Sequence, residues 1–399
     1  MSVVTSLLDR TGWEVTPFGR LTRRSKEAGR PDFAPLSVFL DAGVVPRSDR
    51  EDNHNRLGAD LSNYLVVRPD DIVFNKLRTW QGGLGVSKHT GIVSPAYFVC
   101  RPNEAIDARY YHYLLRSSVY LAELTRLSKF MPPSQFDIGW EDLRDLPVPQ
   151  PPLAEQRAIA DYLDAETARI DALIAKKQQL IHLLEERIVA LIDETCVGRD
   201  ITLRRAIERF VDYRGATPDK TSDGVPLLTA THIKSGSIDH SLEPVFLHHE
   251  TYESWMRRGF PRRGDVLLTM EAPLGEVAQI DSEQVALAQR LMLLKPLREL
   301  CEPDYLAYAF RSTVMQERLR SHATGSTALG IKADRLKGLP LPLPGLTQQS
   351  EAVGVLRRAE EVKSSSVACL QDQVDLLAER RQALITATVT GEFLVPGAA

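Results

Sequence analysis

The chain reads, from residue 147 to residue 198, PVPQPPLAEQRAIADYLDAETARIDALIAKKQQLIHLLEERIVALIDETCVG. Prolines crowd the first six residues, and no further proline or glycine occurs before Gly198. Proline suits the start of a helix and glycine the position just past its end, because neither then breaks an internal helical hydrogen bond. The stretch therefore predicts one helix of about 45 residues, roughly 65 Å long at 1.5 Å per residue.

Apolar residues inside this helix recur at spacings of three, four and seven, which is the seam of a coiled coil. The seam consists of Ile170, Ile174, Ile181, Leu184, Ile188 and Leu191. A lone helix would leave this stripe in water, so the pattern predicts a second helix packed against it.

A second copy of the stretch lies 193 residues further along the chain. Residues 339–344 read LPLPLP, residues 346–349 read LTQQ where 153–156 read LAEQ, and Gly391 stands where Gly198 does. The offset is constant from Ile138 to Gly198, and roughly a third of the aligned pairs are identical. The seam continues through Val367, Leu370, Val374, Leu377 and Leu384. Such a repeat indicates a duplicated unit of globular domain plus long helix. We expect the two helices to pair antiparallel, with Arg381 at the seam either sitting at an edge or pairing with an acid.

Composition excludes several protein classes. With 399 residues the chain is long enough for two to three domains. Its start lacks a signal peptide, and no run of about 18 apolar residues is present, so we expect no membrane span. The four cysteines are scattered singly, which favours free thiols in a reducing cytoplasm. The acid excess lies on the helices and the globular segments are nearly neutral. Any DNA affinity must therefore come from local placement of charge or from a partner.

The first globular segment, residues 1–150, predicts strands followed by a helix. Strands are expected at Trp13–Phe18, Pro35–Leu40, either side of the turn in Val66–Phe74, and Ile92–Val99, with a polar loop over Asp49–Asn63 and an amphipathic helix over Tyr110–Thr125. After the second of the strands in Val66–Phe74 comes NKLRTWQGGLG, residues 75–85. Its glycines lack the flanking pattern of a phosphate-binding loop, but Arg and Gln can bond base edges in a groove. Candidate DNA contacts here are Asn75, Lys76, Arg78, Trp80 and Gln81; the alternative is a solvated hairpin tip.

The second globular segment, residues 199–345, repeats the order with different loop chemistry. A basic cluster near its start corresponds to one in the first segment. The cluster of the second segment is Arg204, Arg205, Arg209 and Arg214, and that of the first is Arg20, Arg23, Arg24, Lys26 and Arg30. The loop Thr269–Gly275 is four residues shorter than its counterpart and carries Glu271 in place of Lys, Arg and Trp. Because Arg and Lys favour guanine whereas Glu can accept from cytosine, the two segments are expected to read different sequences. Further candidate DNA contacts are Lys129, Arg214, Thr231, His232, Lys234, Glu271, Gln289, Arg290, Ser326 and Thr327.

Motifs for catalysis are missing. The sequence contains no zinc-protease, phosphate-loop, amino-methyltransferase, nuclease or serine-elbow pattern at usable spacing. We therefore expect a non-catalytic chain that holds neither metal nor cofactor.

Taken together, these motifs closely resemble the specificity (S) subunit of type I restriction-modification systems. The resemblance rests on residues 146–160, LPVPQPPLAEQRAIA, on residues 381–391, RQALITATVTG, and on Gly264–Leu267 and Gly325–Thr327. It covers nearly the whole chain. The second helix differs in having Gly345 and TQQ before its seam.

The resemblance implies an α/β (α+β) fold with two target recognition domains and two long antiparallel coiled-coil helices, related by a pseudo-twofold axis. The expected parts are recognition domain 1 (1–150), spacer helix 1 (151–198), recognition domain 2 (199–345) and spacer helix 2 with the C-terminal tail (346–399). Each recognition domain would read one half of a split, asymmetric double-stranded DNA sequence.

The resemblance also implies partners. The helices would dock two adenine-N6 methyltransferase (M) subunits, and two restriction (R) subunits can join the assembly. S-adenosylmethionine would belong to the methyltransferase, and ATP and Mg to the restriction subunit. Partner contacts are expected at Glu186, Arg187, Glu379 and Arg380, which are identical in the two helix copies. The competing hypotheses are a coiled-coil scaffold that binds only proteins and a self-contained methyltransferase.

Overall fold

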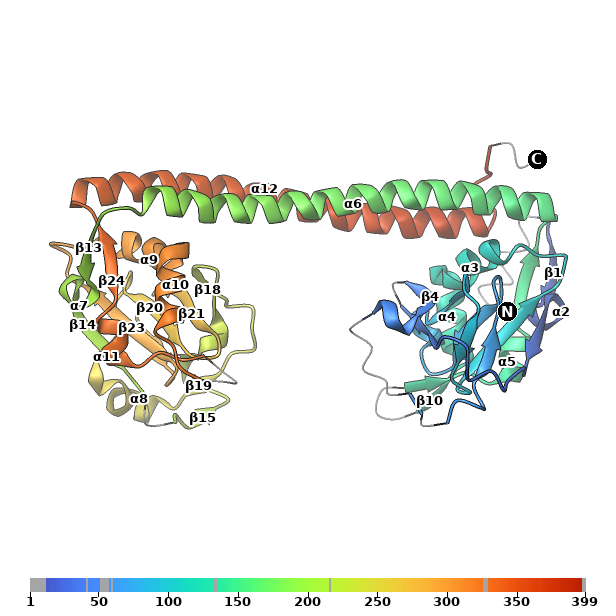
Figure 1. Cartoon of the computed structure of the whole chain (residues 1–399), viewed down its shortest axis with the longest axis horizontal. Coiled ribbons are helices and arrows are strands. Elements are labelled where there is room, and N and C mark those ends of the chain that lie inside the picture. The colour runs from blue at the N-terminus through green and yellow to red at the C-terminus, as the bar shows by residue number, and fades with distance from the viewer. Residues whose placement is uncertain are drawn as a thin grey trace. The chain divides into compact units, whose positions relative to one another are not determined.

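The computed structural model describes residues 12–40, 42–50, 57–58, 60–131, 135–214, 217–325 and 329–396. The chain forms two compact units. Unit 1 comprises Met1–Lys177 and Asp372–Ala399, and unit 2 comprises Gln178–Gln371. Two long helices, α6 (Leu153–Thr195) and α12 (Leu346–Val389), each contribute a part to both units (Figure 1).

Unit 1 is built on a four-stranded antiparallel sheet of order β2-β9-β6-β7. Its strands are β2 (Thr22–Ser25), β6 (Ile72–Asn75), β7 (Leu84–Val86) and β9 (Tyr97–Pro102). The described part of unit 1 also has four two-stranded sheets, formed by β1 (Glu14–Pro17) with β12 (Pro147–Gln150), β3 (Leu36–Phe39) with β4 (Gly43–Pro46), β5 (Leu65–Val67) with β8 (Gly91–Val93), and β10 (Lys129–Met131) with β11 (Gln135–Asp137). The helical segments are α2 (Phe18–Leu21), η1 (Arg47–Asp49), η2 (Thr79–Gln81), α3 (Ala108–Arg116), α4 (Ser118–Leu127) and α5 (Trp140–Arg144).

The central strand β6 is buried on both faces. Ile72 and Phe74 belong to the main core, which includes residues of α3 and the start of α6, whereas Val73 belongs to a smaller core under β3 and β5. All three side chains are fully buried. A strand covered on both faces reads as a continuous apolar run, as residues 72–74 do.

Unit 2 has a four-stranded antiparallel sheet of order β14-β23-β20-β21. Its strands are β14 (Ile207–Asp212), β20 (Val266–Met270), β21 (Leu274–Gln279) and β23 (Leu291–Pro296). Smaller sheets join β15 (Lys220–Thr221), β19 (Phe246–Leu247), β16 (Val225–Leu228) and β22 (Ala286–Leu287), and pair β17 (Ile233–Lys234) with β18 (Ser237–Ile238). The helical segments are α7 (Leu203–Ala206), η3 (Ala230–His232), α8 (His249–Trp255), η4 (Met256–Arg258), α9 (Pro303–Arg311), α10 (Thr313–Ser321) and α11 (Ala333–Lys337).

The strands β2, β9, β6 and β7 of unit 1 thus match β14, β23, β20 and β21 of unit 2 in order and direction. In both units two helices follow the sheet where the sequence predicted one. The single helix expected over Tyr110–Thr125 is wrong because Ser117 takes an extended conformation, with ψ 152°, between α3 and α4. Ser312 breaks the matching helix of unit 2 with ψ 149°. Each serine hydroxyl donates to a carbonyl three residues earlier, a local bond that competes with the helical one.

Two further expectations need correction. The strand expected over Ile92–Val99 is two strands, β8 and β9, which belong to different sheets. The proline runs are not only helix starts, since β12 (Pro147–Gln150) pairs with β1 (Glu14–Pro17) and β24 (Pro340–Leu343) pairs with β13 (Arg199–Thr202). Proline is tolerated because each pair is a two-stranded sheet with free edges.

The two long helices run antiparallel within each unit. In unit 1, Ile159 and Leu163 of α6 share a core with Ile385 and Val389 of α12. In unit 2 the order is the same, with Ile188 and Ile192 beside Leu356 and Val353. Arg381 contacts Asp171, with Nε 2.9 Å from Oδ1. Antiparallel pairing and an acid beside Arg381 are confirmed within the units.

A buried glutamine fastens each helix to its domain. Gln156 is fully buried; its Oε1 accepts from the Asp107 amide (2.8 Å), and its Nε2 donates to the carbonyls of Ala105 (3.2 Å) and Pro151 (2.8 Å). Gln349 makes the same three kinds of bond in unit 2. This role explains why LAEQ and LTQQ share their last residue. It also fixes the start of α12 at Leu346, 193 residues after Leu153.

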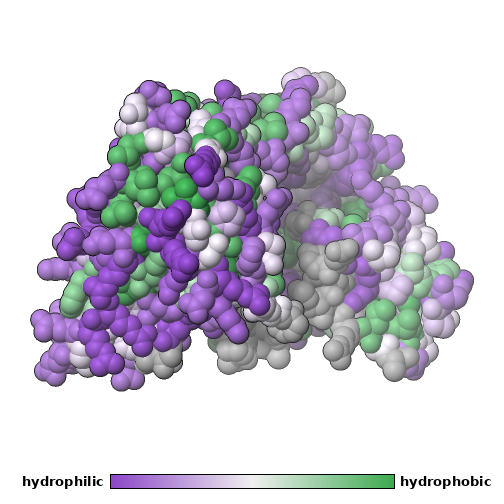
Figure 2. Space-filling model, turned by 60° about the vertical axis from the view of Figure 1, so that its left-hand side comes forward, coloured by the Kyte–Doolittle hydropathy of each residue, from purple (hydrophilic) through white to green (hydrophobic). Residues whose placement is uncertain are grey.

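Gly198 and Gly391 end the helices for different reasons. Gly391 has φ 75°, the left-handed conformation of a helix-ending glycine. At Gly198 a Cβ would lie 2.7 Å from the Pro344 nitrogen, so this glycine permits close approach of the chain to β24. The face shown in Figure 2 is mostly hydrophilic, with hydrophobic residues in small patches. None of the helices in the described part of the chain is long and apolar enough to cross a membrane.

Candidate nucleic-acid interface

The loop between β6 and β7 is a tightly hydrogen-bonded structure that leaves two polar side chains free. The Asn75 amide donates to the Gly83 carbonyl (2.8 Å), and its Oδ1 accepts from the Leu77 amide (3.2 Å). The Gly83 amide closes the loop on the Arg78 carbonyl (2.8 Å). A Cβ on Gly83 would lie 2.7 Å from that carbonyl oxygen, so the fold needs glycine there. Arg78 and Gln81 are exposed at the tip.

Trp80 supports this loop instead of pointing into solvent. Its indole N–H donates to the Leu77 carbonyl (3.2 Å), and its ring lies 4.9 Å from that of Phe136 on β11. Phe136 in turn contacts Phe130 of β10, with centroids 5.2 Å apart. These three rings form an aromatic column that ends in Phe130, which is 56% exposed beside the exposed Lys129. Trp80 is therefore a structural residue of the loop.

Lys76 is half-buried because its ammonium lies 4.7 Å from the centre of the Phe98 ring. The guanidinium of Arg24 lies over the same ring, also at 4.7 Å. Both contacts are cation–π interactions, which hold the two positive groups near the start of the loop.

In unit 2 three of the candidate residues meet at one end of the four-stranded sheet. Glu271 follows β20, Arg290 precedes β23, and their side chains form an ion pair with Arg290 Nε 3.4 Å from Oε1. Both are about half exposed. Arg214 approaches from β14 and donates to the Ile331 carbonyl (3.1 Å), while the Ile331 amide donates to Met270 (3.1 Å).

Asp212 holds Arg214 in place. The guanidinium donates to both carboxylate oxygens, with Nη2 2.6 Å from Oδ2. Burial alone would raise the pKa of the Asp212 carboxyl, but the hydrogen bonds from Arg214 lower it below its usual value. Asp212 is thus an anion that orients Arg214. The sequence showed it only as an acid two residues from an arginine.

The remaining candidates of unit 2 divide into exposed and structural residues. His232 is buried; its Nδ1 lies 3.1 Å from the Thr229 nitrogen and 2.7 Å from its hydroxyl, and burial lowers its pKa. It acts as a cap for η3. Thr231 and Lys234 are exposed in the same segment, which leads into the hairpin β17–β18, and Gln289 is half-buried. Ser326 and Thr327 lie outside the described residues.

The two sheet ends that carry these candidates occupy equivalent positions in their units. β6 ends at Asn75 and β20 at Met270. The chain returns to both places after the helices, since the Ile138 amide donates to Lys76 (3.4 Å) as that of Ile331 does to Met270. The same backbone frame therefore presents Arg78 and Gln81 in one unit and Arg214, Glu271 and Arg290 in the other.

The four candidate partner contacts are exposed on the long helices. Glu186 and Arg187 lie on α6, Glu379 and Arg380 on α12. Glu186 also accepts from His182, with Nε2 3.1 Å from Oε1. Among the described residues no group of three or more His, Cys, Asp or Glu could hold a metal ion.

Comparison with known proteins connects this geometry to a family. Residues 255–366 match the model of the type I restriction modification DNA specificity domain. The EcoKI specificity subunit of Escherichia coli strain K12 is 22% identical over 330 residues, which cover 74% of this chain and 68% of that protein. The Escherichia coli EcoBI specificity subunit is 24% identical over 55% of this chain and 52% of its own length.

These matches indicate a specificity subunit of a type I restriction-modification system. The relatives are named as specificity subunits of restriction enzymes and the matched model as a DNA specificity domain, so the similarity is to the specificity component and not to a catalytic one.

Solved structures share the fold of this specificity subunit. One chain, from work on complex assembly and conformational transition of the type I R-M system, has a TM-score of 0.74 at 17% identity and covers 96% of this chain and 98% of its own. The HsdS subunit of Thermoanaerobacter tengcongensis has a TM-score of 0.52 at 17% identity, covering 96% and 97%.

Sequence reasoning missed Phe130 and Asp212. Phe130 and Phe136 flank Pro132 and Pro133, so two aromatic residues around a proline pair were a possible sign of a hairpin. Which face of that hairpin meets Trp80 depends on contacts across more than 50 residues of sequence.

Proposed function

We propose that this specificity subunit reads a bipartite, asymmetric DNA target, with one half-site read by each unit. The single observation that supports it is the pair of equivalent sheet ends that carry different side chains. A common frame places each reader against DNA in the same way, while the exposed groups decide the bases. Arg78 and Gln81 can bond guanine and adenine edges, and Glu271 with Arg290 offers an acceptor beside a donor.

The proposed domains are residues 1–150, 151–198, 199–345 and 346–399, with duplication giving a pseudo-twofold axis. A single chain with such an axis can imitate the two half-sites of a dimeric DNA reader. The long helices serve as a spacer between the recognition domains.

The outer faces of the helices support a docking role. In unit 2, Leu180, Leu183 and Val362 are 45%, 50% and 66% exposed, and in unit 1 Leu376 is 63% exposed. Apolar side chains at these fractions favour a protein partner. We propose two methyltransferase subunits as that partner, with restriction subunits joining them. In this proposal S-adenosylmethionine, ATP and Mg are bound by the partners, and the assembly works in the cytoplasm.

The test uses the specificity subunit assembled with its methyltransferase. Genomic DNA from cells with and without this gene is sequenced for methylated adenines, and a duplex with the resulting motif is used in a mobility shift at several salt concentrations. The proposal predicts a two-part motif that depends on the gene, and salt-dependent binding that is tightest for that duplex. A scaffold that binds only proteins predicts assembly with equal affinity for every duplex.

A further inference from the structure

Two exposed arginines occupy the same position in each unit. Arg20 is the third residue of α2 and Arg205 the third of α7. Arg23 lies opposite Arg101 in the pairing of β2 with β9, and Arg209 lies opposite Lys295 in the pairing of β14 with β23. The two pairs are thus Arg20 with Arg23 and Arg205 with Arg209.

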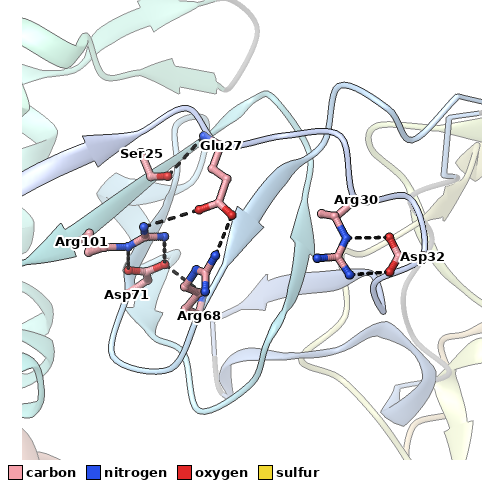
Figure 3. A network of polar contacts seen from close by, with 7 residues as sticks. All are labelled: Ser25, Glu27, Arg30, Asp32, Arg68, Asp71 and Arg101. Atoms are coloured by element: carbon pink, nitrogen blue, oxygen red, sulfur yellow. Dashed lines mark hydrogen bonds and ion pairs between the residues drawn. The ribbon is translucent and has the colours of Figure 1, made fainter.

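The cations facing these arginines are neutralised. Arg101 Nε lies 3.1 Å from Asp71, whose side chain is 2% exposed, and Lys295 Nζ lies 2.5 Å from Asp265. Figure 3 shows Asp71 and Arg101 in one network with Glu27 and Arg68. Each buried aspartate also accepts from a backbone amide three residues earlier. The structure therefore repeats a buried ion pair beneath an exposed arginine.

Arg20, Arg23, Arg205 and Arg209 have no carboxylate partner among the residues that the structure describes. Their guanidinium groups remain available to an anion from outside. Arginine suits phosphate in particular, because its planar donors match two phosphate oxygens.

In unit 1 the arginines line a cleft of about 620 Å³, together with Arg24, Trp140 and Arg144. Arg24 lies over Phe98 and over Trp140 (5.3 Å), and Lys76 of the reading loop lies over the same Phe98. Arg24 of the cleft and Lys76 of the reading loop therefore contact the same ring. In unit 2 a single strand, β14, carries Arg209 and leads to Arg214, five residues or about 16 Å along.

We infer that Arg20 with Arg23, and Arg205 with Arg209, are clamps for DNA backbone phosphates beside the half-site that each unit reads. This inference rests on the proposed function. Phosphates are the same in every sequence, so a phosphate clamp can be identical in two units whose reading loops differ. The shared Phe98 contact in unit 1 and the shared strand β14 in unit 2 favour DNA over a partner protein as the anion.

The test measures how affinity depends on salt. Each phosphate contact contributes about 0.9 to the slope of log affinity against log salt. The methyltransferase complex is prepared with Arg20→Ala/Arg23→Ala or Arg205→Ala/Arg209→Ala. Each double variant is expected to lower the slope by about 1.8, a loss of about 60-fold at 0.1 M salt if affinity at 1 M is unchanged. The loss should be equal for motif and unrelated duplexes, with the methylated motif unchanged.

Controls separate charge from other effects. Arg30→Ala is matched in unit 1, because Arg30 is 49% exposed but forms a bidentate pair with Asp32 (Figure 3). Arg30→Ala should leave the salt slope equal to that of the wild type within experimental error. Arg20→Lys/Arg23→Lys should retain most of the wild-type slope, because the charges remain. Circular dichroism of each variant checks that the fold is intact.

An unchanged slope in both double variants would overturn the inference. A changed methylated motif would also overturn it, because the arginines would then contact bases. Weakened assembly with a normal salt slope in the assembled fraction would overturn it too, because the arginines would then contact the partner protein. A failure of the proposed function looks different: the wild-type complex itself would bind all duplexes equally.

Discussion

The buried glutamine of the LAEQ motif allows a quantitative prediction. Gln156→Ala removes the side-chain oxygen that accepts one hydrogen bond and the side-chain NH2 that donates two. The Asp107 amide and the carbonyls of Ala105 and Pro151 then lose their partner. A buried polar group left unsatisfied costs about 1–3 kcal/mol. Allowing for water that enters the space, we expect a loss of about 3 kcal/mol in the free energy of unfolding of unit 1.

Urea denaturation followed by tryptophan fluorescence measures this loss. Trp13, Trp80 and Trp140 lie in unit 1 and Trp255 in unit 2, so a Trp255→Phe background reports on unit 1. With a slope of about 2 kcal/mol per molar urea, the midpoint should fall by about 1.5 M.

Arg157→Ala is the matched control, because Arg157 follows Gln156 on α6, lies in unit 1 and is exposed. It should shift the midpoint by less than about 0.3 M, since surface substitutions usually cost under about 0.5 kcal/mol. A Gln156→Ala midpoint equal to that of the control would refute the assignment of this glutamine as the fastening between helix and domain.

Three further changes have expected outcomes. Arg78→Ala combined with Gln81→Ala should relax the specificity of the half-site read by unit 1, by about 1–3 kcal/mol per lost base contact. Arg290→Ala should relax the specificity of the other half-site only. Methylation sequencing measures both, and relaxation of both half-sites by either variant would count against separate readers. Charge reversal at Glu186, Arg187, Glu379 and Arg380 should weaken co-purification of the methyltransferase, and undiminished recovery would argue against these contacts. Four residues inserted at Ala175 add about one helical turn and 6 Å, so the DNA spacer between the half-sites should grow by one or two base pairs. One or two inserted residues turn the domain by about 100° each and should abolish methylation. An unchanged spacer would mean that this helix does not set the distance between the half-sites.

Much of the fold could be predicted because its signals are local or repeated. The heptad seam gave the long helices, and the constant offset gave the equivalence of Gln156 with Gln349. The seam also placed Arg381 at an edge or beside an acid, and the structure has it beside Asp171. These features depend on helical periodicity, which sequence displays directly.

The features that sequence could not show depend on contacts between distant segments. The proline run at 147–150 becomes strand β12 because β1, more than 120 residues earlier, pairs with it. Trp80 and His232 belonged to polar, loop-like stretches that suggested exposed readers, but Phe136 and Thr229 draw them inward. Conversely, Arg214 and Arg290 come together only because β14 and β23 are neighbours in the sheet.

The central claim is that each unit reads its own half of the target, and a domain exchange tests it most directly. Residues 199–345 are replaced by the corresponding segment of a type I specificity subunit whose target is known, and methylated sites in the cell are sequenced. The account predicts a two-part motif in which one half is the donor's and the other half, read by unit 1, is unchanged. A motif in which both halves change, or one that is not divided into two parts, would contradict it.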